Sequence, residues 1–129
     1  MARSYVANGN IGPSRFVKLD TTAPGKVLEA TTNDKMCGIS QAGTRRAPQT
    51  GIDDGYAAIA GENIQVFEPG DVCWVEAGGT IAIDDRLEAT TDGKAVTTTT
   101  DNDWGGAKAL QSGVSGQLIK VEVLQVGRY

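Results

Sequence analysis

The sequence predicts an all-β protein, a small antiparallel β-barrel or sandwich with an extended N-terminal arm. Its 129 residues include 17 Gly and 4 Pro, and these turn-forming residues recur between short apolar runs. The runs have the length of strands and are too short for ordinary helices. Thirteen Thr favour the same class, because the β-branched side chain fits a pleated surface. The length corresponds to one domain, which we place at residues 14–129 after an arm at residues 1–13.

The expected arm carries little core-forming pattern and includes the polar run Asn8-Gly9-Asn10. A flexible tail is the simpler interpretation of such a segment. The alternative is an arm that becomes ordered across a neighbouring subunit, with Arg3, Tyr5 and Val6 supplying the contacts. The sequence leaves both interpretations open.

Three turns divide the rest of the chain. Ala23-Pro24-Gly25-Lys26 and Glu68-Pro69-Gly70-Asp71 each fit a type II turn, in which Pro sets the first corner and Gly accepts a positive φ at the second. Asp92-Gly93 predicts a type I′ hairpin. The candidate strands between these and other turns are residues 15–19, 26–30, 38–41, 56–60, 63–67, 72–76, 80–83, 86–89, 95–99, 108–111 and 117–126.

Two of these runs predict how their strands are buried. In the last run, apolar Ile119, Val121 and Val123 alternate with charged residues, which indicates one buried face. The alternation shifts at Leu124, so we expect a bulge or a second buried face there. The run at residues 72–75 is apolar on both parities and predicts a central strand covered on both sides, with Trp74 in the core.

Two segments of the chain resemble each other. Residues 20–27 and 89–96 share a Thr-rich turn followed by Lys and Val, and residues 38–43 resemble residues 108–113. Two related hairpin units within one barrel would produce this similarity. Independent convergence of Thr-rich hairpins on similar turns would produce it equally well.

Charge is uneven along the chain. Residues 1–50 hold 7 basic and 3 acidic side chains, whereas residues 51–129 hold 5 basic and 13 acidic ones, so the net charges are +4 and −8. Opposite potentials on two sides of the molecule would orient it on a partner or on copies of itself. Uneven surface loops are the simpler explanation.

The composition excludes several classes of function. Without His there is no Ser-His-Asp triad and no His general base or metal ligand. Two Cys cannot form a four-thiolate zinc site or an iron–sulfur cluster. A net charge of −4 does not suit DNA binding, and no apolar run suits a signal peptide or a membrane span. We therefore expect no catalytic residue, cofactor or metal, and neither a nucleic-acid nor a membrane partner.

Individual motifs agree with this. The Gly-Lys pairs at 25–26 and 93–94 lack the other residues of a phosphate-binding loop. Residues 101–112 lack the EF-hand ligands at positions 5 and 12. Asp pairs at 53–54 and 84–85 lie beside turns, where Asp bonds locally, and adjacent strand residues face opposite ways.

The remaining residues of interest are cysteines and candidate contacts. Cys37 and Cys73 are expected to be reduced and buried, although a disulfide between them is an alternative. Trp104, in a polar Gly-rich segment, is either a loop anchor or an interface aromatic. The candidate interface residues are Arg3, Tyr5, Val6, Arg45, Arg46 and Trp104.

Five motifs follow one another toward the C-terminus. They are Gly61-Glu62-Asn63-Ile64-Gln65-Val66, Glu68-Pro69-Gly70-Asp71-Val72, Glu76-Ala77-Gly78-Gly79-Thr80-Ile81, Asp85-Arg86-Leu87 with Thr91-Asp92-Gly93-Lys94-Ala95-Val96, and Gly116-Gln117-Leu118-Ile119-Lys120-Val121. In this order they resemble the phage capsid cement, or head decoration, proteins, and the resemblance covers roughly residues 15–126. The segment at residues 44–55, with Arg45 and Arg46, is less typical of that family.

The resemblance implies a non-enzymatic virion protein, assembled in the host cytoplasm, on the capsid exterior. Such a protein binds the outer surface of the mature shell, often as a homotrimer, and clamps major capsid protein subunits against DNA pressure. The alternatives are another virion component, such as a head fibre or tail subunit, and a small β-barrel binding module. Seven aromatic residues are few for a binding module with a concave aromatic surface.

Overall fold

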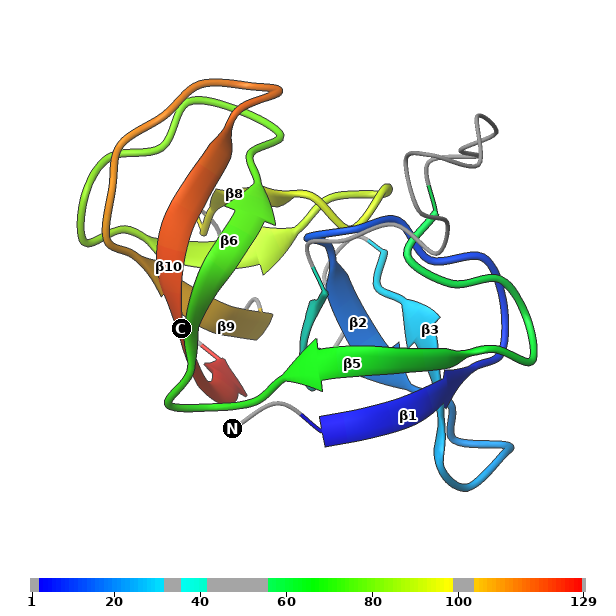
Figure 1. The fold of residues 1–129 in the computed structure, drawn as a ribbon. Helices are drawn as coiled ribbons and strands as arrows, with labels where there is room; N and C mark the ends of the chain where they lie inside the picture. The colour runs from blue at the N-terminus through cyan, green and yellow to red at the C-terminus, as the bar shows by residue number, and fades with distance from the viewer. Residues whose placement is uncertain (1–2, 32–35, 42–55, 99–103, 129) are drawn as a thin grey trace.

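Ten strands and no helix make up the described part of the chain, which comprises residues 3–31, 36–41, 56–98 and 104–128 of a computed structural model. The strands form two units of five that lie side by side (Figure 1). The first unit contains β1 (Arg3–Ala7), β2 (Phe16–Leu19), β3 (Lys26–Glu29), β4 (Gly38–Ser40) and β5 (Asn63–Phe67). The second contains β6 (Val72–Glu76), β7 (Arg86–Ala89), β8 (Ala95–Thr97), β9 (Trp104–Ala109) and β10 (Leu118–Arg128).

The first unit is a closed barrel with the strand order β1-β3-β2-β4-β5. Its closure depends on β1, which pairs in parallel with β3 and antiparallel with β5. The apolar side chains that face the barrel interior are small or branched: Ala7, Ile11, Val17, Val27, Ala57, Ala58, Ile64 and Val66. A closed barrel leaves no unpaired edge in this unit.

The expected N-terminal arm is corrected by this arrangement. Residues 3–7 form a barrel strand rather than an extension, and Ala7 and Ile11 are fully buried. The pattern of this segment gives little sign of a strand, because its hydrogen-bond partners lie about 20 and 60 residues away in β3 and β5.

The second unit repeats the topology of the first. Its strand order is β6-β10-β9-β7-β8, and a parallel bridge between Ala77 and Ala95 joins the two edges. If the two edges of the second sheet are taken as neighbours, β6, β7, β8, β9 and β10 have strand neighbours that correspond to those of β1, β2, β3, β4 and β5 in the first unit. Local details also recur: Ser14 and Asp84, 70 positions apart, both have a positive φ, at 54° and 75°.

The similarity between residues 20–27 and 89–96 therefore has a structural basis. The two segments are the equivalent hairpin turns β2–β3 and β7–β8, and they lie in two separate units rather than in one barrel. Gly25 and Gly93, which end these turns, both have a φ of 76°.

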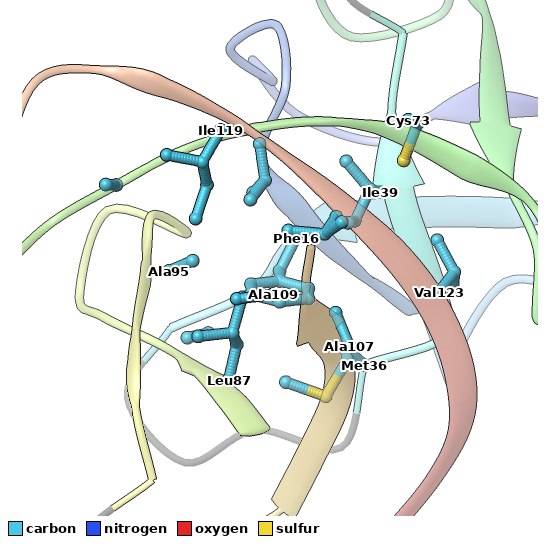
Figure 2. Packing of buried hydrophobic residues seen from close by; sticks show 14 of the residues in the cluster. Phe16, Met36, Ile39, Cys73, Leu87, Ala95, Ala107, Ala109, Ile119 and Val123 are labelled. Carbon is cyan, nitrogen blue, oxygen red and sulfur yellow. The ribbon is translucent and has the colours of Figure 1, made fainter. Parts of the chain in front are cut away.

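The larger apolar core lies mainly in the second unit and includes four buried residues of the first, Phe16, Ala30, Met36 and Ile39. Phe16 on β2 and Ile39 on β4 are fully buried, and they pack with second-unit residues such as Leu87 and Ile119 (Figure 2). Val17, the neighbour of Phe16, belongs to the interior of the first barrel instead. Because successive strand residues face opposite sides, β2 is buried on both faces and serves as a wall shared by the two cores.

Most of the predicted strands are present. The bounds of β5, β6 and β7 match the predictions, whereas the runs at residues 56–60 and 80–83 contribute only isolated bridges, at Ala58 and Ile81. The pairing of β10 with β9 shifts register between Val123 and Gly127, which agrees with the bulge that was one of the two expectations for this run. Gly25 and Gly70 have the positive φ expected of type II turns. The type I′ prediction is wrong, because Gly93 but not Asp92 has a positive φ.

Truncation of Phe16 tests the shared wall. We expect Phe16→Ala to lower the free energy of unfolding by about 3–5 kcal/mol, because it leaves a cavity between the two units. The chain should still unfold in a single transition, as one domain does, since both units lose packing together. Denaturant unfolding followed by circular dichroism measures both quantities.

The control is Leu19→Ala on the same strand, whose side chain is 51% exposed. We expect its effect to stay within about 0.5 kcal/mol. Two separate transitions in the wild-type protein, or equal costs for the two variants, would contradict a shared core.

Candidate functional site

The structure does not gather the six candidate interface residues into one described site. Arg3, Tyr5 and Val6 lie in β1, and Tyr5 packs partly against the interior of the first barrel. Arg45 and Arg46 lie outside the described residues. Trp104 begins β9, where its backbone is paired with β10, but its side chain lies outside the described part. Their role in an interface stays a prediction.

Trp74, by contrast, is corrected from core to surface. The burial of β6 alternates, so that Cys73 and Val75 face the core while Val72 and Trp74 are 51% and 44% exposed. Only the side of the strand that carries Cys73 and Val75 is covered, because successive strand residues face opposite sides. The sequence does not reveal this one-sided burial, because in the run at residues 72–75 the outward residues are as apolar as the inward ones.

The neighbours of Trp74 come from β10 and β9. On β10, Lys120 lies directly opposite Trp74 in the antiparallel register. Leu118 is two residues before Lys120 on β10, and its side chain is 51% exposed. The backbone N–H of Leu110, just beyond β9, donates to the carbonyl of Lys120 at 2.9 Å. We call Val72, Trp74, Leu110, Leu118 and Lys120 the β6–β10 outer face. Sequence reasoning missed this surface, because only the register reveals which side chains share it.

A second cluster of functional interest joins the two units. The Arg15 guanidinium, from the first unit, donates from Nη1 to the Asp92 carbonyl oxygen at 2.9 Å and from Nη2 to Glu76 Oε1 at 3.2 Å. The other Glu76 carboxylate oxygen lies 3.1 Å from Lys94 Nζ. The side chains of Arg15 and Glu76 are only 20% and 24% exposed, so water screens their ion pair less than a surface pair.

The same cluster is anchored on the side of the first unit. Glu29 Oε2 accepts a hydrogen bond from the Gly12 N–H at 2.8 Å and lies 4.0 Å from Arg15 Nη1. The Ser40 hydroxyl accepts from the Arg15 N–H at 3.0 Å and donates to the Gly12 carbonyl at 2.7 Å. These bonds fix the backbone between Gly12 and Arg15, which helps to hold the guanidinium where it reaches the second unit.

The two structural units differ less in net charge than the two parts of the sequence on either side of residue 50. Residues 1–67 hold 7 basic and 6 acidic side chains, and residues 72–129 hold 5 basic and 8 acidic ones. The net charges are therefore +1 and −3, compared with +4 and −8 for a division at residue 50. The boundary between the barrels lies about 20 residues later than that division, so two oppositely charged sides receive little support.

The chemistry available to the described residues is limited. Among them, no group of three or more Cys, Asp or Glu is placed to hold a metal ion. Cys37 and Cys73 are free thiols, and burial raises the pKa of Cys37 to about 11 and that of Cys73 to about 12. Both thiols are therefore protonated at neutral pH, which makes them poor nucleophiles. No helix that could span a membrane occurs in the described ranges.

These features define an all-β protein built from a closed five-stranded barrel and a five-stranded sheet with the same topology. Comparison with known families makes the assignment specific: the model of the structural cement protein family (E217 gp24/Pam3 gp6) matches residues 2–124. The chain therefore belongs to this family of phage cement proteins, which are structural components of the virion and bind the capsid.

One solved structure gives an independent comparison of the fold. It is described as the head fiber gp8.5 N base in bacteriophage phi29, with a TM-score of 0.64 at 20% sequence identity. The match covers 98% of this chain and 96% of that one, so both barrel units are included. A comparison with curated proteins finds no match.

The ion pair of Arg15 yields a prediction about stability. We expect Arg15→Met to lower the free energy of unfolding by about 1–3 kcal/mol, because Glu76 would keep a partly buried charge with one partner fewer. The control is Lys108→Met, whose partner Asp84 is 3.8 Å away with a side chain that is 80% exposed. Loss of that surface pair should cost less than about 1 kcal/mol. Equal costs in urea unfolding would show that the Arg15 cluster does not stabilise the junction.

The thiols give a prediction about reactivity. At pH 8, below both raised pKa values, we expect Cys37 and Cys73 to react slowly with a disulfide reagent in the folded protein. Unfolding in guanidinium exposes them and lowers each pKa toward about 8.5, so labelling of two thiols should become fast. Fewer than two thiols in the unfolded, unreduced protein would reveal a disulfide instead.

Proposed function

We propose that this protein binds the outer surface of the mature phage capsid as a homotrimer and stabilises the shell without catalysing a reaction. The observation that carries the proposal is the family match over residues 2–124, which includes both barrel units. The partner would be the major capsid protein. The absence of His from the sequence and the raised pKa values of both thiols support a role that requires no chemistry.

The physical mechanism is stabilisation by mass action. A protein that binds the assembled shell but not its separated subunits shifts the equilibrium toward the shell. Many symmetric copies, each linking neighbouring capsid subunits, add avidity without requiring strong individual contacts. The shared core and the Arg15 cluster suit this task, because a rigid connection between the two units transmits load from one contact to the other.

A head fibre subunit is the second candidate. The observation that favours it is the similarity of the whole chain to the phi29 head fiber base. At 20% identity this similarity concerns the fold, whereas the family match is to cement proteins, so we rank the fibre function second.

The proposal is tested with purified protein and undecorated capsids. We expect the protein to co-sediment with expanded shells and to raise the temperature at which they release DNA or disassemble. Unexpanded precursor shells are the control, and we expect them to bind less because the mature lattice is absent. No binding to expanded shells, at salt concentrations where they stay intact, would contradict the cement function. Elongated projections in electron micrographs of decorated shells would favour the fibre function.

A further inference from the structure

The corner that follows β1 carries an asparagine–glycine pair. Asn8 is exposed, and its backbone N–H donates to the Val27 carbonyl at 2.9 Å, which continues the pairing of β1 with β3. The Gly9 N–H makes no hydrogen bond with any residue that the structure describes. The side-chain carbonyl carbon of Asn8 therefore has an unbonded backbone nitrogen as its next neighbour along the chain, and Gly9 has no side chain to keep the two atoms apart.

The Asn8 side chain ties this corner to the turn between β2 and β3. Its Nδ2 donates to Asp20 Oδ2. The other carboxylate oxygen, Asp20 Oδ1, accepts from the Thr22 N–H at 2.9 Å and from the Thr22 hydroxyl at 2.7 Å. The bonds from Thr22, and then the one from Asn8, lower the pKa of Asp20 below its ordinary value. The carboxylate that faces the Asn8 amide is therefore charged at neutral pH.

The equivalent corner of the second unit shows what the backbone alone requires. There, a Gly-Gly pair at residues 78–79 stands where the first unit has its Asn-Gly pair. The Gly78 N–H still donates to the Ala95 carbonyl, at 2.7 Å. The backbone bond at this corner thus forms without a side chain, and the Asn8 amide acts on the first barrel through its hydrogen bond with the β2–β3 turn.

We propose that Asn8 is a site of spontaneous deamidation, and that its conversion weakens the contact between the β1 corner and the β2–β3 turn. The Gly9 nitrogen attacks Asn8 Cγ and forms a new C–N bond. Its proton passes through water to Nδ2, which leaves as ammonia. Water then opens the cyclic imide at one of its two carbonyl carbons and leaves aspartate or isoaspartate. Both products carry a carboxylate beside the charged Asp20, so a hydrogen bond is replaced by repulsion.

The conversion consumes only water and involves this chain alone, so it does not depend on the proposed function. It adds a negative charge where β1 closes the first barrel, and it proceeds for as long as the folded protein persists. Members of this family are structural components of the virion, in which a protein is not replaced after assembly. The extent of conversion should therefore increase with the age of the particle.

Peptide mapping by mass spectrometry of the folded protein, incubated at mildly alkaline pH, tests the reaction. We expect Asn8 to deamidate at least about tenfold faster than Asn10, which is also exposed but precedes the β-branched Ile11. The Ile11 N–H is also bonded to the Ala58 carbonyl, at 2.9 Å. Isoaspartate should appear at position 8, because it forms only through the cyclic imide. Equal rates at the two positions, or conversion of Asn8 in the unfolded protein alone, would overturn the proposal.

A substitution at position 9 hinders the reaction and keeps the contact with Asp20. Gly9→Ala should be accommodated, because its Cβ would lie 3.4 Å from Leu28 Cδ2, an ordinary contact, and Gly9 does not have a positive φ. We expect deamidation of Asn8 to slow by at least about fivefold in this variant, since the added methyl group hinders the approach of the two reacting atoms. An undiminished rate would show that the Gly9 nitrogen is not the attacking group.

An exchange of the two side chains tests the consequence for the barrel. We expect Asn8→Asp to lower the Tm by about 2–4 °C, because a hydrogen bond is lost and two carboxylates face each other. Combining Asn8→Asp with Asp20→Asn should regain most of this shift, since the amide then lies at position 20 and still offers Thr22 an acceptor oxygen. Equal Tm values for the single variant and the exchanged pair would show that the contact with Asp20 does not carry the effect.

Discussion

The two-sided burial of β2 and β4 is the constraint on which the rest of the structure depends. Phe16 completes the core between the units while its neighbour Val17 fills the first barrel. All three residues of β4 are buried, and a side chain at Gly38 would place its Cβ 2.1 Å from the Phe67 carbonyl oxygen. Because Phe16 and Ile39 pack into the core of the second unit, removal of either unit would expose apolar side chains of the other.

The shared wall also explains how a chain whose core contains little apolar area can hold its two units together. Many of its buried residues are Ala, which contributes little apolar area. The chain compensates by burying both faces of β2 and by placing the Arg15 cluster at the rim of the junction. The two units therefore share one apolar core and one cluster of ion pairs.

Local sequence patterns were sufficient for much of the fold and for little of the candidate surface. The strands at residues 63–67, 72–76 and 86–89 are predictable because turns bound them closely. The strand β1 is not predictable in this way, because its place depends on partners in β3 and β5. The exposure of Trp74 follows from the tertiary packing that covers only the opposite face of β6, which no local pattern contains. The same holds for the adjacency of Leu110 and Asp84, since a tertiary hydrogen bond from the Asp84 N–H to the Ala109 carbonyl creates it.

Electron cryo-microscopy of expanded shells decorated with the purified protein tests the central claim most directly. The account predicts compact density on the outer shell surface that fits both barrels as one rigid body at each binding position. Density for the two barrels in different relative orientations from site to site would contradict the shared wall. Density confined to the tail or to an elongated fibre would contradict the cement function.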